Sequence, residues 1–474
     1  MSAPRLRQTN WVSQEFNSHP MNRIALLAGT LGLATFLLLS ASSAVQAKPG
    51  LAIDATQAGA VGDGVTLDTL AIQKAIDSCN AQGGGTVSFP AGRYLTGTIQ
   101  LKDNVTLHLD DQAVIFGSTN PADYRNLDPF KAGDGIPQGY ALIVADGASN
   151  VGIEGAGSID GQGVALKAAQ KKYIVRPFLV RWLRCTGITV KDAHLGGSGA
   201  WAMNFFQCKN AAVTHVTIHN RGLVNNDGID IDSCQTVRIS DCNIDSGDDA
   251  ICLKTTSAIP CGDIIATGCT LTTICNGIKL GTESLGDFTN IQVSQCQLHN
   301  IGMAGIALYS VDGANMHNVT ISDITMDGVS VPICMRLGAR LKTFRDGDQA
   351  KPVGTLRDIT IQNVRATGIR QIGILINGIP GHPVEALTLE NIDLQVPGGG
   401  TADEAQVQLP EKEAAYPEYS MFGKVMPAYG IYLRHAQGVS FKNVQTHVSK
   451  PDGRPAMVQL DTQNVTPAGY NPTP

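Results

Sequence analysis

A short strand-like unit recurs along this sequence at nearly regular intervals. Each copy has an Ile, an outward-facing position, a second aliphatic residue and another outward-facing position, the alternation of a strand with one buried face. Copies begin at Ile229, Ile251 and Ile278, with spacings of 22 and 27 residues. Further copies are placed at Ile306, Ile333, Ile374 and Ile431, and earlier ones at Met203 and Phe178. One short strand per repeat predicts a parallel solenoid in which each turn of chain lies on the turn before it.

The composition agrees with a thin, regular coil. Of the 474 residues 43% are hydrophobic, so the chain can bury a large core, while aromatic residues make up only 5% and glycine contributes 52 residues. Such a composition favours narrow strands and tight turns. The formal net charge of −6 and the lack of a strongly basic run argue against a nucleic-acid partner.

Stacking converts sequence offsets into columns of side chains, because equivalent positions on neighbouring turns lie about 4.8 Å apart. Asp227, Asp249 and Asn276 each stand two residues before a repeated Ile, so we expect them in one column, with Asp248 beside it. The outward positions of the strands carry further charges, at Asp230, Asp232, Lys254, Lys279 and, two turns on, Arg336.

Carboxyl groups this close raise one another's pKa, and a reaction that needs one protonated and one ionised carboxyl benefits from the arrangement. Inverting glycoside hydrolysis is such a reaction, because one carboxylic acid protonates the leaving oxygen while a carboxylate about 6.5–9.5 Å away activates water. Neighbouring turns offset by one residue can supply that separation. The acid cluster is therefore the candidate catalytic site.

The first residues have the pattern of a targeting segment. A short positive region at 21–23, an apolar stretch at 24–39 and the small-residue pattern at 45–47 are typical of a cleavable leader. We expect a signal peptide over residues 1–47, with Met21 as an alternative start, and one domain over residues 48–474. This predicts a secreted or periplasmic protein without stable membrane association after cleavage. An uncleaved membrane anchor is the alternative.

Three segments outside the strands have their own predictions. Residues 68–79 carry apolar side chains at helical spacing, with Asp68 as N-cap, and predict a helix that covers the open end of the solenoid. The polar loop 118–140 is long enough to wall a site. The gap between Ile374 and Ile431 gathers Tyr416, Tyr419, Phe422 and Tyr429, which form either a platform for sugar rings or a self-packed loop.

The cysteines leave two interpretations open. There are 11, an odd number, so at least one is unpaired in an exported chain. Cys208, Cys234 and Cys261 open successive turns of the predicted coil. We expect either stacked buried thiols or one or two disulfides, and the spacings do not resemble a zinc site.

The motifs around the acids resemble glycoside hydrolase family 28, the polygalacturonases and their relatives. The similarity is carried by Asn-Asp-Gly-Ile-Asp at 226–230, Asp-Asp at 248–249, the glycine-bearing strand at 277–281, Gly-Ala-Val-Gly-Asp-Gly at 59–64 and Gly-Ser-Ile-Asp-Gly-Gln-Gly at 157–163. It extends over nearly all of residues 48–474. The resemblance implies an all-β, single-stranded, right-handed parallel β-helix, to which the sequence adds the N-terminal capping helix.

The same resemblance implies roles for individual residues. Asp248 is the expected general acid, while Asp227 and Asp249 hold the attacking water. Asp230 falls on a further acid of the motif, and Asn276 is expected to contact substrate. Members of the family are inverting hydrolases that need no metal, so no metal and no other cofactor is expected.

Two departures from the family motifs concern the substrate. Polygalacturonases carry Gly-His-Gly where this chain has Cys275-Asn276-Gly277, and Arg-Ile-Lys, which holds the uronate carboxylate, where it has Arg336-Leu337-Gly338. Lys279 or Arg340 could restore the missing charge. A uronate on a protein of net charge −6 must be met by local cations, and the expected ones are Lys254, Lys279, Arg336 and Arg340.

We therefore expect a monomeric hydrolase that acts on a pectic polysaccharide or oligosaccharide and cleaves α-galacturonosidic bonds, with endo and exo action both open. Rhamnogalacturonan or another cell-wall glycoside is the alternative substrate. Calcium-dependent β-elimination, which other parallel β-helix proteins perform on pectate, is the competing reaction. A non-catalytic sugar-binding or adhesive solenoid is the competing function outside enzymes, and it has no evident use for the acid cluster.

Overall fold

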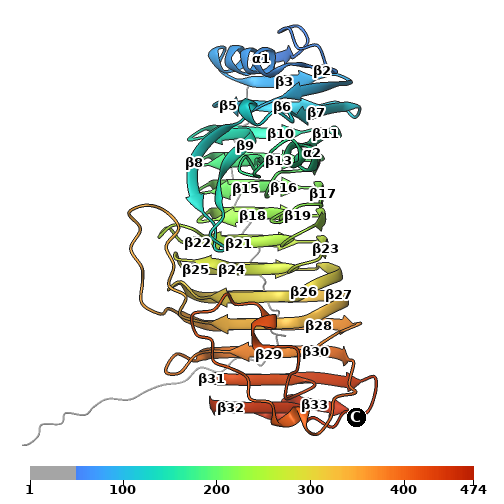
Figure 1. The fold of residues 1–474 in the computed structure, drawn as a ribbon, viewed down its shortest axis with the longest axis vertical. Coiled ribbons are helices and arrows are strands. Elements are labelled where there is room, and N and C mark those ends of the chain that lie inside the picture. The colour runs from blue at the N-terminus through green and yellow to red at the C-terminus, as the bar shows by residue number, and fades with distance from the viewer. Residues whose placement is uncertain (1–49, 474) are drawn as a thin grey trace, which may run out of the picture. The chain divides into compact units, whose positions relative to one another are not determined.

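The computed structural model describes residues 50–473, all of which belong to one compact unit. The signal peptide predicted for residues 1–47 lies outside the described residues. Within residues 50–473, none of the helices has the length and apolarity that a bilayer crossing requires. The architecture is a right-handed parallel β-helix, as predicted, with its turns stacked in chain order (Figure 1).

Three stacks of parallel strands form the faces of the coil. The first stack contains β1 (Ala52–Asp54), β3 (Gly85–Phe89), β6 (Val105–Leu109), β10 (Ser149–Glu154), β13 (Thr186–Lys191), β16 (Lys209–Thr214), β19 (Gln235–Ser240), β22 (Cys261–Thr267) and β25 (Phe288–Ser294). It continues through parts of the long strands β27 (Asn315–Leu337), β28 (Thr355–Thr367), β30 (Val384–Val396) and β31 (Ile431–Val448).

The second stack follows the first along each turn. It contains β2 (Asp63–Leu67), β4 (Gly92–Thr96), β7 (Ala113–Gly117), β11 (Ser158–Asp160), β14 (His194–Gly196), β17 (Thr217–Asn220), β20 (Asn243–Ser246), β23 (Thr270–Thr273) and the start of β26 (Gln297–Ser310). Segments of β27, β28, β30 and β31 extend it to β33 (Tyr470–Thr473).

The third stack carries the repeated units. It contains β5 (Ile99–Leu101), β9 (Pro137–Asp146), β12 (Phe178–Leu183), β15 (Met203–Phe206), β18 (Ile229–Asp232), β21 (Ile251–Thr255), β24 (Ile278–Ser284), the ends of β26 and β27, β29 (Ile374–Asn377), the start of β31, and β32 (Met457–Gln463). The repeat predicted from Met203 to Ile431 is aligned residue for residue in this stack. One copy is corrected, because Val180 and not Phe178 pairs with Met203.

The inward residues of the three stacks form one continuous core. The repeated Ile residues of the third stack are fully buried, as the alternation predicted. All 11 cysteines are free thiols, and all but Cys275 are buried. Cys208 and Cys234 stack on neighbouring turns, with the Cys208 N–H 3.2 Å from the Cys234 sulfur. Stacked thiols are therefore the arrangement that the structure shows.

Helix α1 (Thr69–Ala81) packs on β1, β3, β5 and β6 at the N-terminal end of the coil, where the sequence predicted a capping helix. Its buried face is Ile72, Ala75, Ile76 and Cys79. Asp68 precedes the helix but makes no cap hydrogen bond. Its carboxylate instead accepts from the Val61 and Gly62 N–H groups, so it fixes the preceding loop.

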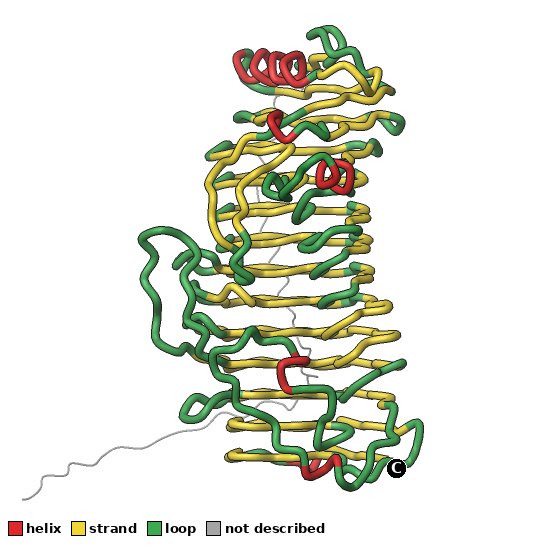
Figure 2. The backbone as a smooth tube through the Cα atoms, viewed as in Figure 1, coloured by secondary structure: helices red, strands yellow, loops and turns green. Residues whose placement is uncertain are grey.

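Several segments leave the regular coil, and Figure 2 shows most of them as green loops and short red helices, and strand β8 in yellow. The predicted loop 118–140 contains η1 (Pro121–Asp123) and strand β8 (Arg125–Lys131), which pairs antiparallel with β9. Helix α2 is short (Gly163–Ala168). The loop 338–354, gold in Figure 1, contacts β8 through the Lys131 N–H and Phe344 carbonyl. The loop 397–430 carries η2 (Glu404–Gln406) and η3 (Tyr419–Phe422), and η4 (Pro467–Gly469) precedes β33.

Candidate active site

Asp227, Asp249 and Asn276 form one column across three turns, as their offset from the repeated Ile predicted. Each lies in the short connection that leads from the second stack into the third. The strands after these connections pair in register. The Gly228 N–H donates to the Asp249 carbonyl at 2.9 Å, and the Ala250 N–H to the Asn276 carbonyl at 2.9 Å. Backbone hydrogen bonds between turns therefore fix the spacing of these three side chains.

A small pocket of about 30 Å³ opens at this column, with room for one or two water molecules. The pocket is walled by segments from outside the coil as well as by the strands. Its lining residues are Ala132, Asp134, Trp201, Asn225, Asp227, Asp248, Asp249, Lys254, Glu283 and Tyr416. Ala132 and Asp134 come from the turn between β8 and β9, so the long loop predicted to wall a site does so. Tyr416 comes from the loop 397–430.

Lys254 lies between three buried carboxylates. Its ammonium is 3.6 Å from Asp227, 3.4 Å from Asp230 and 3.5 Å from Glu283, and it also lies over the Trp201 ring at 4.8 Å from the centroid. Burial opposes the charge of Lys254, but these acids raise its pKa well above the ordinary value. Lys254 is therefore the cation that keeps this group of acids buried together.

Asp249 is held as an anion by the next turn. One oxygen accepts from the Asn276 side-chain N–H at 2.8 Å, and the other lies 2.9 Å from the Lys279 ammonium. Burial alone would raise the pKa of Asp249, but Lys279 and Lys254 outweigh it and lower the pKa to about 2. Asp249 is therefore ionised throughout the neutral range.

Asp227 and Asp248 have the opposite tendency. Burial, together with Asp230 and Asp248, raises the pKa of Asp227 well above its ordinary value. Burial and the adjacent Asp249 raise the pKa of Asp248. One Asp227 oxygen is buried without a hydrogen-bond partner among the described residues. The pocket thus holds proton-retaining carboxyl groups beside an ionised one, which is the division of roles that acid–base catalysis requires.

Two acids of the site were missed in the sequence. Glu283 on β24 accepts from the Gly133 N–H at 2.6 Å and so ties the β8–β9 turn to the coil. Burial raises its pKa, but Lys254 and Arg340 lower it to about 2. Glu418, from the loop 397–430, lies 3.2 Å from Lys279. Glu283 could have been found as the acid at an outward position of the strand that carries Lys279, whereas no repeat predicts the position of Glu418.

Arg340 and Arg336 take up different positions. Arg340 is not part of the pocket lining; its guanidinium pairs with the Asp312 carboxylate and donates to the Thr282 carbonyl at 3.1 Å. Arg336 lies outside the pocket lining, and its guanidinium donates to backbone carbonyls of Gly378 at 2.8 Å, Glu411 at 2.8 Å and Lys412 at 3.2 Å. Arg336 therefore attaches the loop 397–430 to the coil.

The aromatic residues of that loop pack mainly against the coil. Phe422 is buried in a second apolar cluster that includes Tyr309 and Tyr432, and Tyr419 packs against it. Tyr429 belongs to the main core. Of the four aromatics gathered here, Tyr416 is the one that lines the pocket. The self-packed loop is therefore the better description, with one ring available to a ligand.

Asp248, Asp249 and Cys275 each offer one ligand atom, and these atoms lie within 4.8 Å of one another. The set suits calcium poorly. Calcium takes six to eight oxygen ligands, whereas one member of this group is a thiol. Both Asp249 oxygens are also already engaged by Asn276 and Lys279.

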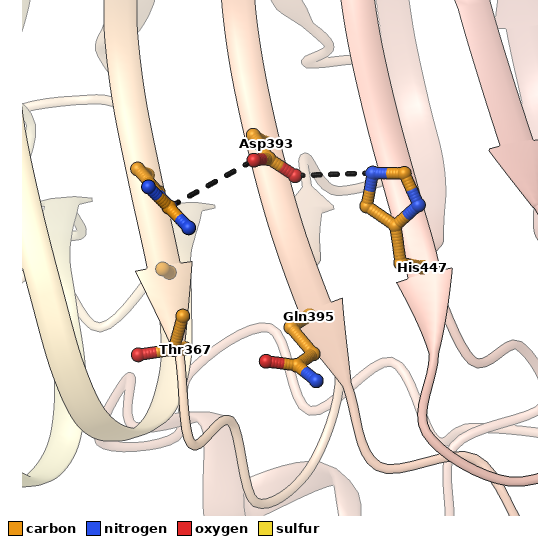
Figure 3. Close-up of a pocket in the computed structure, with 6 residues that line it drawn as sticks. Thr367, Asp393, Gln395 and His447 are labelled. Atoms are coloured by element: carbon orange, nitrogen blue, oxygen red, sulfur yellow. Dashed lines mark ion pairs between the residues drawn. The ribbon is translucent and has the colours of Figure 1, made fainter.

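A second hollow lies on the second stack, at β28, β30 and β31 (Figure 3). Asp393 stands between Arg365, at 3.9 Å, and His447, at 3.2 Å. These side chains are largely exposed. The hollow lacks the buried carboxyl groups of the acid pocket, which therefore remains the candidate active site.

Comparison with known proteins places this geometry in a family. The sequence model of glycosyl hydrolases family 28 matches residues 79–415, which include every residue of the acid column. A probable polygalacturonase of Vitis vinifera is 26% identical over 71% of this chain and 73% of its own. An exopolygalacturonase of Zea mays is 26% identical over 75% of this chain and 87% of its own.

The fold is shared as well. The structure of the Yersinia enterocolitica family 28 exopolygalacturonase has a TM-score of 0.66 to this chain at 20% identity, over 87% of this chain and 78% of its own. Because the family match covers well over half of the sequence, together with the coil and its acids, the chain belongs to the glycosyl hydrolases of family 28 and is a glycoside hydrolase.

Proposed function

We propose that this protein is a secreted, inverting hydrolase of pectic polysaccharides or oligosaccharides. The observation that carries the proposal is the adjacent pair Asp248 and Asp249, in which one pKa is raised and the other is lowered to about 2 inside a single pocket. Such a pair supplies a proton donor and an anion at the same pH. The polygalacturonase names of the relatives support pectin as the substrate.

In the proposed reaction Asp248 is the general acid. Its proton passes to the glycosidic oxygen as the bond from that oxygen to the anomeric carbon breaks. Asp227 and Asp249 hold a water molecule on the opposite side of the sugar, and the water oxygen bonds to the anomeric carbon while its proton passes to this carboxyl pair. Direct attack by water inverts the anomeric configuration.

The surrounding residues are proposed to orient these groups. Lys254 and Asp230 lie next to Asp227, and Lys279 and Asn276 fix both Asp249 oxygens. Side chains held in place in this way reduce the reorganisation needed when charge moves during the reaction. No step of the proposed mechanism passes through a metal ion.

Two kinds of glycosidic bond are candidates for the bond that is cleaved. The relatives named exopolygalacturonase favour an α-galacturonosidic bond and exo action, in which the walls from the β8–β9 turn and the loop 397–430 would close one end of the site. The cations of the site are already paired with carboxylates of the protein, which favours cleavage of a glycosidic bond to an uncharged sugar of pectin. Secretion rests on the leader predicted for residues 1–47.

A panel of pectic polysaccharides and oligosaccharides, analysed by product sizing and ultraviolet absorbance, tests the proposed function. We expect saturated products, unchanged rates in chelator, and loss of activity in Asp248→Asn but not in Asp263→Asn. Asp263 is an exposed Asp of the coil with positive φ, a conformation that Asn also accepts. Unsaturated products that disappear with chelator would establish β-elimination, and binding without turnover would establish a sugar-binding solenoid.

A further inference from the structure

Glu418 occupies a position that the strand repeat does not predict. It belongs to the loop 397–430, 139 residues beyond Lys279, and is 9% exposed. Three donors converge on its carboxylate: the Lys279 ammonium at 3.2 Å, the Asn276 side-chain N–H at 3.2 Å and the Tyr309 hydroxyl at 3.3 Å. Burial raises the pKa of Glu418, whereas the hydrogen bonds from Lys279 and Asn276 lower it, and a site with three donors and no acceptor suits its ionised form.

Two carboxylates therefore pair with the Lys279 ammonium. Its ammonium contacts Asp249 at 2.9 Å on one side and Glu418 at 3.2 Å on the other. The rings of Tyr309 and Tyr416 lie 5.9 and 5.7 Å away, and Lys279 is 2% exposed. Lys279 therefore has little charge or surface left for an anionic sugar.

The other cations around the pocket are also engaged. Lys254 contacts three carboxylates, and Arg340 pairs with Asp312. Lys342, on the same loop as Arg340, donates to the Gly133 carbonyl at 3.0 Å. Among the described residues that line the pocket, Lys254 is the single cation, against the acids Asp134, Asp227, Asp248, Asp249 and Glu283.

We propose that Glu418 sets the charge specificity of the enzyme: by neutralising Lys279 it makes the cleavage subsite accept an uncharged sugar of pectin and reject a galacturonate. The inference rests on the proposed function and refines its substrate. Recognition of a sugar carboxylate needs a free Arg or Lys, preferably one that can bind both oxygens. Here a carboxylate would have to displace Glu418 from Lys279 or lie against acids, and placing like charges together is an effective way to exclude a ligand.

The test compares substrates that differ only in the group at carbon 6, which is charged in one of them and uncharged in the other two. The probes are the aryl α-glycosides of galactose, galacturonic acid and galacturonic acid methyl ester. We expect kcat/KM for the two uncharged compounds to exceed that for the acid by about 100-fold or more, since like-charge contacts cost several kcal/mol and each factor of ten corresponds to about 1.4 kcal/mol. A wild-type enzyme that prefers the acid would overturn the inference.

Two variants connect the preference to Glu418. Glu418→Gln keeps the size of the side chain and removes its charge, so the ratio should shift toward the acid by about tenfold or more. Glu413→Gln, in the same loop, is the matched control, because the exposed Glu413 side chain makes no hydrogen bond or ion pair within residues 50–473. A loop that is merely loosened would lower all three rates together. An unchanged ratio in Glu418→Gln would assign the selectivity to another group and refute the proposal.

A binding measurement separates this inference from the proposed function. Asp248→Asn is titrated calorimetrically with polygalacturonate and with the same polymer fully methyl-esterified. Tighter binding of the ester supports the charge specificity even if neither polymer is hydrolysed, in which case the proposed function alone would fail. Tighter binding of the acid, or no binding of either polymer, would overturn the inference.

Discussion

Glu283 offers a quantitative test of how the buried charges are arranged, because its carboxylate connects the β8–β9 turn to Lys254. The pKa of Glu283 is lowered from 4.5 to about 2. At about 1.36 kcal/mol per pKa unit, this difference stabilises the folded state by about 3 kcal/mol at pH 7. Glu283→Gln retains an acceptor for the Gly133 N–H and leaves Lys254 paired with Asp227 and Asp230. The lost charge is therefore the main change.

The effect should depend on pH with a defined sign. A carboxyl whose folded-state pKa is lowered contributes stability that is complete above its unfolded pKa and disappears as pH falls through the folded pKa. The wild type should therefore exceed Glu283→Gln in free energy of unfolding by about 3 kcal/mol at pH 7 and by about 1 kcal/mol at pH 3. Urea titrations at the two pH values measure the difference, with Glu385→Gln as a control. A difference independent of pH, or below about 0.5 kcal/mol at pH 7, would refute this account of the ion pairs.

Four further substitutions examine the catalytic roles and the loop 397–430. Asp248→Asn should lower kcat by about 10²–10⁴ at an unchanged melting temperature, because a positioned acid is lost without loss of packing. Asp227→Asn and Asp249→Asn should likewise lose activity. Steady-state kinetics measure these rates, and a near-wild-type rate in any of the three variants would remove that residue from the mechanism. Arg336→Ala should lower the free energy of unfolding by about 3 kcal/mol in urea titrations, because three backbone carbonyls lose a charged donor. The preference between acidic and neutral glycosides should stay the same, and a selective loss of activity on the acidic substrate would show instead that Arg336 binds a carboxylate.

The sequence was sufficient to predict the coil and the acid column. Side chains that alternate between buried and outward positions, inside a repeat of 22 to 28 residues, are compatible with few folds. The same repeat determines which residues pair between turns in the third stack. Asp227, Asp249 and Asn276 share an offset from that repeat, so their proximity could be predicted from sequence spacing alone. The sequence predicts a copy at Phe178, two residues before the residue that pairs with Met203, because the apolar alternation of β12 continues on both sides of Val180.

The contacts made by loops could not be predicted in this way. Glu418 reaches Lys279 from 139 residues away, and its position depends on the path of the loop 397–430. Arg336 has the outward position expected of a substrate-binding cation, yet the carbonyls of the same loop accept its hydrogen bonds. Asp68 stands at the position of an N-cap in the sequence, but its carboxylate accepts hydrogen bonds from two N–H groups of the preceding loop instead. Local patterns predict positions in the coil, while the partners at those positions come from distant segments.

The anomeric configuration of the first product tests the central claim most directly. Nuclear magnetic resonance, recorded during early hydrolysis of the best substrate in the panel, shows the configuration before mutarotation changes it. If Asp248 donates the proton while water held by Asp227 and Asp249 attacks directly, the first product has the anomeric configuration opposite to that of the substrate. A first product with retained configuration would contradict this mechanism and would require a covalent intermediate on one of the carboxylates.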